Sequence, residues 1–143
     1  MSTDRVLLVD DEVEFVETLA ERLRIRGLEV EVAHTGPDGV AKAEAARFDA
    51  VVLDFAMPGM DGIATLKALL AVNPDLQAML LTGHATIKTA AEATRLGAVD
   101  VLEKPTDIDT LLEKIREARA RRLALTDDRA RKQVEVVLKT RGW

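Results

Sequence analysis

The chain has 143 residues, of which 48% are hydrophobic and 31% charged, and it contains no cysteine. This length suits one domain with a sizeable core, and the lack of cysteine excludes disulfides and thiolate metal sites. No apolar run approaches the roughly 20 residues needed to span a bilayer, and residues 1–5 lack the features of a signal peptide. We therefore expect a cytoplasmic protein without a membrane segment.

The net charge of −5 is unevenly distributed along the chain. Residues 114–143 contain 10 Lys and Arg against 4 Asp and Glu, whereas the remaining residues contain 10 against 21. An acidic body argues against nucleic-acid binding by that part of the chain. The basic tail is too short for a helix-turn-helix domain, which needs several helices around its own core. We therefore expect no direct DNA binding.

Five short apolar runs bounded by turn residues predict buried strands. They lie at residues 6–9, 30–33, 50–53, 79–81 and 99–102. Between them, apolar residues at helical spacing predict four amphipathic helices, three of which have clear stop signals at Gly27, Asn73–Pro74 and Gly97. A fifth helix follows the last strand, with Thr106 as its N-cap and Asp109 three residues further on as a capping-box variant.

The predicted order is therefore five β–α units, which favours a doubly wound α/β fold with a parallel sheet covered by helices on both faces. The fifth helix becomes rich in arginine towards its end, and we place a boundary there, between residues 1–122 and 123–143. In the second part a short apolar pattern predicts one more helix, capped by Thr126 or Asp127. This basic part is interpreted as a solvated helical extension, a homodimer contact or docking segment, or the start of a linker.

Polar side chains that could bind a metal ion or take part in a reaction fall at or just past the ends of the proposed strands: Asp10, Asp11, Asp54, Thr82 and Lys104. In an open parallel sheet these carboxyl ends converge on one crevice, so the side chains are expected to meet. Three carboxylates repel one another unless a cation joins them, and oxygen ligands favour a hard ion such as Mg²⁺. A carboxylate can also act as a nucleophile towards phosphorus, with a lysine and a hydroxyl stabilising the phosphoryl oxygens.

With these residues in place, the sequence closely resembles the receiver domains of bacterial two-component response regulators. The resemblance covers roughly residues 4–122 and is carried by four pieces in order, each after an apolar run: Val9-Asp10-Asp11, the segment 53–62 (LDFAMPGMDG), Leu81-Thr82-Gly83 and Glu103-Lys104-Pro105. Each piece alone is commonplace, but the four together are specific. The resemblance implies a flavodoxin-like five-stranded parallel sheet of order 2-1-3-4-5.

The resemblance also implies a role for each matching residue. Asp54 is the phosphoacceptor, and a Mg²⁺ ion, with Mn²⁺ as a substitute, is bound directly by Asp11 and with help from Asp10. The backbone carbonyl of Ala56 is a further metal ligand. Thr82 bonds a phosphoryl oxygen, and Lys104 pairs with the phosphoryl group. The Lys104–Pro105 peptide bond is expected to be cis, a geometry largely confined to bonds before proline.

Partners follow from the same resemblance. The phosphoryl donor is a phosphohistidine on a sensor histidine kinase or a phosphotransfer protein, and acetyl phosphate is a small substitute. Phosphorylation shifts a pre-existing equilibrium and alters a surface that an output partner binds. The domain is then not an enzyme in the usual sense, since it catalyses only its own phosphorylation and dephosphorylation.

Two departures from the family pattern concern switching and the lifetime of the phosphoryl group. Val101 stands where the family often has a switching Tyr or Phe, so activation must run through backbone shifts or other packing. Ala56 and His84, each two residues after a site residue, occupy positions that tune the lifetime of the phosphoryl group. Ala56 has no polar side chain to orient water, and His84 is interpreted as a base, a steric cover, a partner contact or a residue without a role.

Two rival functions belong to other classes. A magnesium-dependent phosphohydrolase resembling the haloacid dehalogenase-like phosphatases would share the aspartyl-phosphate chemistry, but it wants a second acid where Ala56 stands. A pure interaction module would keep the fold without being phosphorylated, and the complete acidic set argues against it. Structural readings also exist for single residues, since Asp10-Asp11 could cap the first helix.

Overall fold

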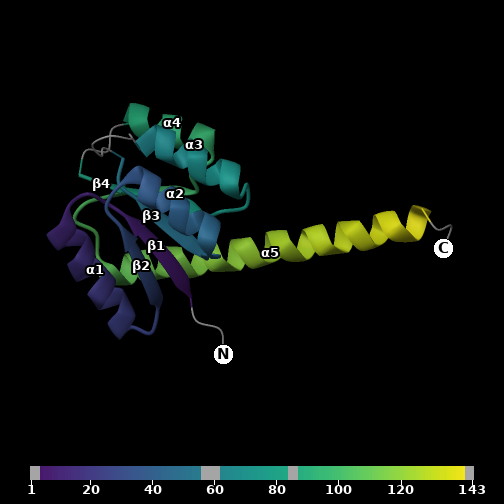
Figure 1. Ribbon diagram of the computed structural model, residues 1–143, viewed down its shortest axis with the longest axis horizontal. Coiled ribbons are helices and arrows are strands. Elements are labelled where there is room, and N and C mark those ends of the chain that lie inside the picture. The colour runs from purple at the N-terminus through teal and green to yellow at the C-terminus, as the bar shows by residue number, and fades with distance from the viewer. Residues whose placement is uncertain (1–3, 56–61, 84–86, 141–143) are drawn as a thin grey trace.

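The computed structural model describes residues 4–55, 62–83 and 87–140, with side chains described as far as residue 136. Five strands alternate with five helices along these residues (Figure 1). The elements are β1 (Arg5–Val9), α1 (Val13–Ile25), β2 (Glu29–Ala33), α2 (Gly36–Ala45), β3 (Ala50–Leu53), α3 (Gly62–Val72), β4 (Ala78–Thr82), α4 (Ile87–Leu96), β5 (Asp100–Glu103) and α5 (Ile108–Thr140).

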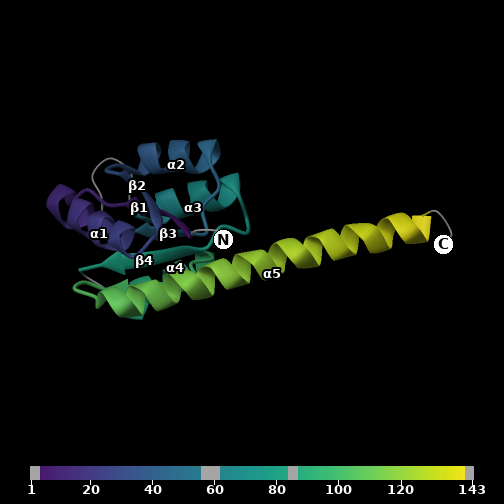
Figure 2. The ribbon, with the colours of Figure 1, turned by 90° about the horizontal axis from the view of Figure 1, so that it is seen from below.

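The strands form one parallel sheet in the order β2-β1-β3-β4-β5. Helices α1 and α5 pack on one face of the sheet, and α2, α3 and α4 pack on the other (Figures 1 and 2). This arrangement confirms the predicted doubly wound α/β fold and its strand order. Because all five strands are parallel, their carboxyl ends lie at the same edge of the sheet.

The two faces of the sheet are built from alternate residues of the same strands. In β3, Ala50 and Val52 belong to the core under α1 and α5, whereas Val51 and Leu53 belong to the core under α2, α3 and α4. Because successive side chains of a strand point to opposite faces, a central strand needs an unbroken apolar run. The run ends at Asp54, which therefore emerges at the carboxyl edge.

Helix ends agree with the sequence in some places and differ in others. Gly27 and Gly97 have φ angles of 91° and 114° and follow α1 and α4, so both predicted stops are confirmed. The predicted cap at Thr106 is wrong, because α5 begins at Ile108. Asp107 precedes the helix, and its carbonyl accepts a hydrogen bond from the Leu111 amide at 3.0 Å.

Helix α5 is a single helix of 33 residues, so the separate short helix predicted after Thr126 or Asp127 is wrong. No glycine or proline lies within it, and the Thr126 hydroxyl donates to the Arg122 carbonyl one turn back instead of capping a new helix. Asp128 pairs with Lys132 at 3.1 Å, a spacing that supports a continuous helix. The boundary placed after residue 122 falls inside α5 and stays a prediction. The helix projects well beyond the sheet (Figures 1 and 2).

No helix among residues 4–55, 62–83 and 87–140 is both long enough and apolar enough to cross a bilayer.

Candidate functional site

The carboxyl edge of the sheet gathers the predicted site residues. Asp10, Asp54 and Lys104 directly follow β1, β3 and β5, and Thr82 is the last residue of β4. Their backbones continue the sheet: the Asp54 amide donates to the Val9 carbonyl at 2.9 Å, and the Lys104 amide donates to the Thr82 carbonyl at 2.8 Å. Asp10, Asp54 and Thr82 are only 4%, 6% and 4% exposed. The sheet therefore fixes these polar groups in a largely dry crevice.

Lys104 lies at the centre of this crevice. Its Nζ is 2.8 Å from Asp10 Oδ2, 2.8 Å from Glu12 Oε1 and 3.7 Å from Asp54 Oδ2. The same nitrogen is 4.3 Å from the centre of the Phe15 ring, a cation–π contact. One ammonium group thus lies within 4 Å of three carboxylates from two segments of the chain, Asp10 and Glu12 after β1 and Asp54 after β3.

The charge state of Lys104 follows from these neighbours. Burial by itself lowers the pKa of the lysine, because a low-dielectric surrounding disfavours the charged form. Hydrogen bonds to Asp10 and Glu12, together with the attraction of Asp10 and Asp54, outweigh that effect and hold the pKa above its ordinary value. Lys104 is therefore a full positive charge at neutral pH, held next to Asp54.

The carboxylates themselves could hold a cation. One oxygen each from Asp10, Glu12 and Asp54 lies within 4.8 Å of the others, and all are hard oxygen donors of the kind that Mg²⁺ prefers. Asp11, expected as the direct ligand, is half-buried beside this group but is not part of it. The donor set therefore fits a magnesium ion, while the predicted division of labour between Asp10 and Asp11 stays a prediction. Ala56, the other expected ligand, lies outside the described residues.

Asp10 is also fixed by a second interaction. Its Oδ1 accepts a hydrogen bond from the Glu12 amide at 2.9 Å, so its two oxygens face different partners. The N-cap residue of α1 is Glu12, and no side chain caps this helix. Helix capping by Asp10 and Asp11 is therefore not the reason for the acidic pair.

Comparison with known proteins now decides the family. The family model described as "Response regulator receiver domain" matches residues 6–116. This chain belongs to the response regulator receiver family. Among curated relatives, the transcriptional regulatory protein ZraR of Salmonella typhimurium is 41% identical over 115 residues, which cover 80% of this chain and 26% of ZraR.

Solved structures agree with this assignment. A CheY-like receiver domain protein from Methanospirillum hungatei has a TM-score of 0.81 and 30% identity, with 86% of this chain and 98% of that chain covered. A response regulator from Burkholderia pseudomallei, solved with a phosphorylated aspartic acid and a calcium ion, has a TM-score of 0.75 and 26% identity, with 97% and 86% covered. Receivers are signalling modules, and the predicted family and fold are confirmed.

This receiver spans about a quarter of the length of the first curated relatives that it matches. Those relatives are named transcriptional regulatory proteins, as is the C4-dicarboxylate transport regulator DctD of Rhizobium meliloti. The names of these relatives weakly contradict the expectation of no direct DNA binding, if that expectation is applied to a longer protein that contains such a receiver. That expectation rested only on the charge and length of residues 1–143 and is restricted to them.

The remaining predicted site residues are either placed by the structure or lie outside the described residues. The Lys104–Pro105 peptide bond is cis. Thr82 is buried at the end of β4, and Val101 is a half-buried residue of β5 that packs against the core under α2, α3 and α4. His84 lies outside the described residues, so its role is still a hypothesis.

Two residues of the receiver's crevice, Glu12 and Phe15, were missed from the sequence. Glu12 directly follows the acidic pair Asp10-Asp11, and this third acid in a row was a usable signal for its place in the cluster. Phe15 fitted the apolar pattern of α1 and was taken as a core residue; nothing in the sequence indicates that its ring meets Lys104.

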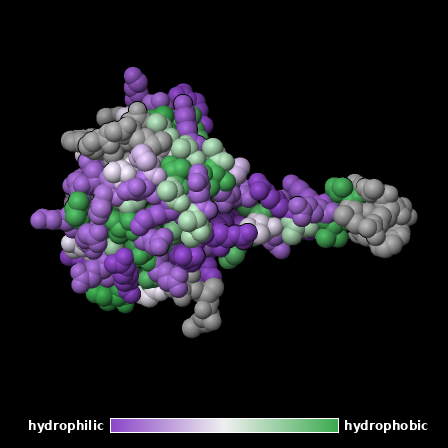
Figure 3. Space-filling view, viewed as in Figure 1, coloured by the Kyte–Doolittle hydropathy of each residue, from purple (hydrophilic) through white to green (hydrophobic). Residues whose placement is uncertain are grey.

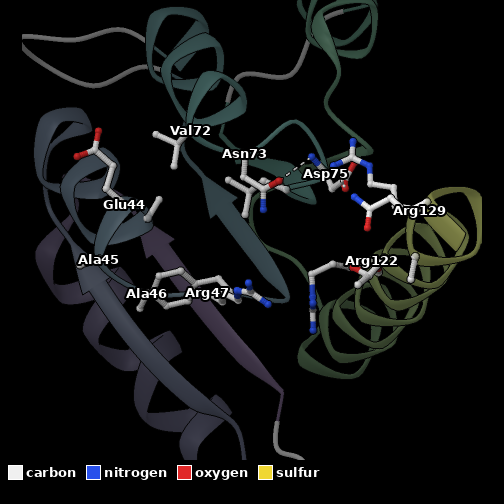
Figure 4. Close-up of a pocket in the computed structure, with 15 residues that line it drawn as sticks. Glu44, Ala45, Ala46, Arg47, Val72, Asn73, Asp75, Arg122 and Arg129 are labelled. Atoms are coloured by element: carbon white, nitrogen blue, oxygen red, sulfur yellow. Dashed lines mark hydrogen bonds and ion pairs between the residues drawn. The ribbon is translucent and has the colours of Figure 1, made fainter. Parts of the chain in front are cut away.

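A separate cavity of about 630 Å³ lies at the other end of the sheet (Figure 4). Its walls come from the ends of α2 and α3, the segments before β3 and β4, and α5, and they include Phe48, Asp75, Arg122 and Arg129. Figure 4 shows Arg129 of α5 beside the loop that carries Asp75. None of the carboxylates near Lys104 lines this cavity, so it is not part of the crevice.

Proposed function

We propose that this receiver accepts a phosphoryl group on Asp54 and thereby switches a surface that a partner binds. The observation that carries the proposal is the convergence of Asp10, Asp54 and the charged Lys104 at one edge of the sheet. Asp54 is buried but lies next to a cation, which keeps a carboxylate available as a nucleophile. The presence of a phosphorylated aspartic acid in the related Burkholderia structure supports this chemistry by similarity.

In the proposed reaction, an Asp54 carboxylate oxygen forms a bond to phosphorus as the bond from phosphorus to the donor breaks. With a phosphohistidine donor, the electron pair of the P–N bond stays on the imidazole nitrogen, which takes up a proton. Lys104 stabilises negative charge on the phosphoryl oxygens, and the Thr82 hydroxyl donates a hydrogen bond to one of them. Burial of Asp54 limits access of water to the acyl phosphate.

A Mg²⁺ ion, or Mn²⁺ in its place, would be held by Asp10 and Asp54 with Asp11 or Glu12, and would neutralise charge on the phosphoryl oxygens. Three carboxylates close together bind such an ion more readily than one carboxylate alone. Lys104 supplies a positive charge 3.7 Å from Asp54 Oδ2 from within the chain itself.

The proposed partners are a sensor histidine kinase or phosphotransfer protein as donor and an output element as recipient of the signal. The curated relatives suggest that the output is control of transcription in a longer protein of this kind. The receiver catalyses its own phosphorylation and dephosphorylation and acts on no other substrate. A homodimer contact through α5 remains one way in which such a signal is passed on.

The test is intact-mass analysis after incubation with acetyl phosphate, with and without Mg²⁺. Wild type is expected to gain one phosphoryl group per chain only with Mg²⁺, and Asp54→Asn is expected to gain none. Asp127→Asn, which changes an exposed acid on α5 in the same way, is the matched control and should label like wild type. Continuous release of phosphate without a stable adduct would instead indicate a phosphohydrolase. No adduct from acetyl phosphate or from a phosphohistidine donor would indicate an interaction module.

A further inference from the structure

Glu12 differs from the other carboxylates around Lys104 in its exposure. Its side chain is 60% exposed, whereas those of Asp10 and Asp54 are 6% and 8% exposed. Even so, its Oε1 is as close to the lysine nitrogen as Asp10 Oδ2 is, at 2.8 Å. Lys104 is thus held by one buried carboxylate and by one that reaches in from the solvent side.

The hydrogen-bonding capacity of Lys104 is limited. An ammonium group has three N–H donors, and two of them are directed at Asp10 and Glu12. Asp54 Oδ2, at 3.7 Å, is beyond hydrogen-bond distance. The Phe15 ring occupies space 4.3 Å from the nitrogen and offers no acceptor oxygen. The third N–H is left for one phosphoryl oxygen, and a second hydrogen bond to a phosphoryl group on Asp54 requires the lysine to give up a carboxylate partner.

Glu12 is the partner that the surroundings release most easily. Asp10 is buried and its other oxygen accepts the Glu12 amide, so it cannot exchange Lys104 for water by turning outward. Glu12 regains water as soon as its side chain turns outward, and exposed ion pairs are weak for this reason. The exposed glutamate is therefore an exchangeable partner and the aspartate a fixed one.

We propose that Glu12 is a positioning residue that restrains Lys104 and competes with the phosphoryl group for its ammonium. The inference rests on the proposed phosphorylation of Asp54 and adds a device that sets how far the equilibrium lies towards the phosphorylated form. Glu12 acts through Lys104 and does not touch the reacting atoms. Removing its charge frees one lysine N–H for the phosphoryl oxygens.

The test is a double-mutant cycle of Glu12→Gln and Lys104→Met at saturating Mg²⁺. Two quantities are measured: the rate of labelling by acetyl phosphate, and the affinity for beryllofluoride, a phosphoryl mimic, followed by ¹⁵N NMR. Glu12→Gln is expected to raise both by about two- to fivefold, as the loss of one exposed competing ion pair implies. In the Lys104→Met background the same change is expected to have no effect. Glu14→Gln, an exposed acid on the same helix, is the matched control and should leave both unchanged.

Three results would overturn the inference. An equal effect of Glu12→Gln with and without Lys104 would mean that the glutamate acts as a general negative charge. A fall in labelling together with a weaker Mg²⁺ dependence would make Glu12 a metal ligand instead. An effect of Glu14→Gln as large as that of Glu12→Gln would remove its specificity. A wild-type protein that neither labels on Asp54 nor binds beryllofluoride would sink the proposed function itself, which is a separate outcome.

Discussion

Gly62 is the residue on which the position of the Asp54 segment depends most directly. It is buried at the start of α3, and its amide donates to the Phe55 carbonyl at 2.7 Å. A Cβ atom at this position would lie 2.2 Å from that carbonyl oxygen and 2.5 Å from the Phe55 Cα. Both atoms are backbone, so neither can turn away. Position 62 therefore cannot carry a side chain unless the backbone of Phe55, next to Asp54, moves.

We predict that Gly62→Ala lowers the free energy of unfolding by about 1–3 kcal/mol, the usual range for overpacking. It should also slow labelling of Asp54, because relief of the clash moves the backbone next to the nucleophile. Urea unfolding and intact-mass labelling measure the two effects. Gly83→Ala is the control, since its Cβ would meet no atom of the described residues within 4 Å, and its change should stay below about 1 kcal/mol. Equal stability of the two variants would contradict this account.

At the residue scale, the sequence predicted the members of the crevice better than their contacts. The meeting of Asp10, Asp54, Thr82 and Lys104 follows from parallel strands whose carboxyl ends share an edge. The pairing of Lys104 with Glu12 does not follow, because it depends on how far a flexible lysine reaches across the crevice. A pattern of residue types gives the end of a strand, but it does not give the direction of a long side chain.

Among the elements, α5 is held to the sheet by polar contacts as well as by its apolar face. Asp49, 5% exposed, precedes β3 and receives hydrogen bonds from the Arg5 amide at 2.8 Å and from Arg122 Nε at 2.9 Å. Arg119 bonds Asp4 at 3.2 Å, and Arg129 bonds Asp75 at 2.9 Å. The arginines of the basic tail, which the sequence suggested to be solvated, therefore form ion pairs that hold α5 against the amino ends of the strands.

We predict that Asp49→Asn lowers the free energy of unfolding by about 1–3 kcal/mol, because it takes the charge from a buried acceptor that faces arginine. The asparagine keeps an oxygen for the Arg5 amide, so the loss reports mainly on α5. Urea denaturation followed by circular dichroism gives the value. Asp127→Asn changes an exposed acid on the same helix and should cost less than about 0.5 kcal/mol. If the two variants proved equally stable, the contact between Asp49 and α5 would not hold the helix.

The elements also show where sequence patterns are sufficient. The five apolar runs gave all five strands to within one or two residues, because a doubly covered strand must be apolar throughout. The length of α5 was not predictable in the same way. Beyond Ala118 no described residue of α5 belongs to the buried core, and the contacts of this part with the body include ion pairs with Asp49 and Asp75, which lie far away in the sequence.

The whole molecule consists of a compact α/β body and a projecting helix end. Figure 3 shows the projecting part of α5 as a mostly hydrophilic stem with some hydrophobic side chains towards its end. Exposed hydrophobic residues on it include Leu123, Val134 and Val136, at 46%, 58% and 62%. The ion pairs of Asp128 with Arg131 and Lys132 lie within the stem itself. Hydrogen bonds from Lys132 and Arg131 lower the pKa of the Asp128 carboxyl group. The ion pairs therefore persist at neutral pH and weaken only as the pH falls through that lowered pKa.

We therefore predict that the stem contributes helix but little stability to the body. Deleting residues 131–143 should reduce the helical circular dichroism signal and leave the free energy of unfolding within about 0.5 kcal/mol of wild type, because isolated helical segments are marginal in water. Deleting residues 119–143 should destabilise the body strongly, since it removes Arg119, Arg122 and Arg129 together with their partners' charge compensation. Both are measured by urea unfolding at two protein concentrations. A large loss from the shorter deletion that shrinks as the protein is diluted would contradict the prediction, because it would mean that the stem of wild type is packed against a second copy.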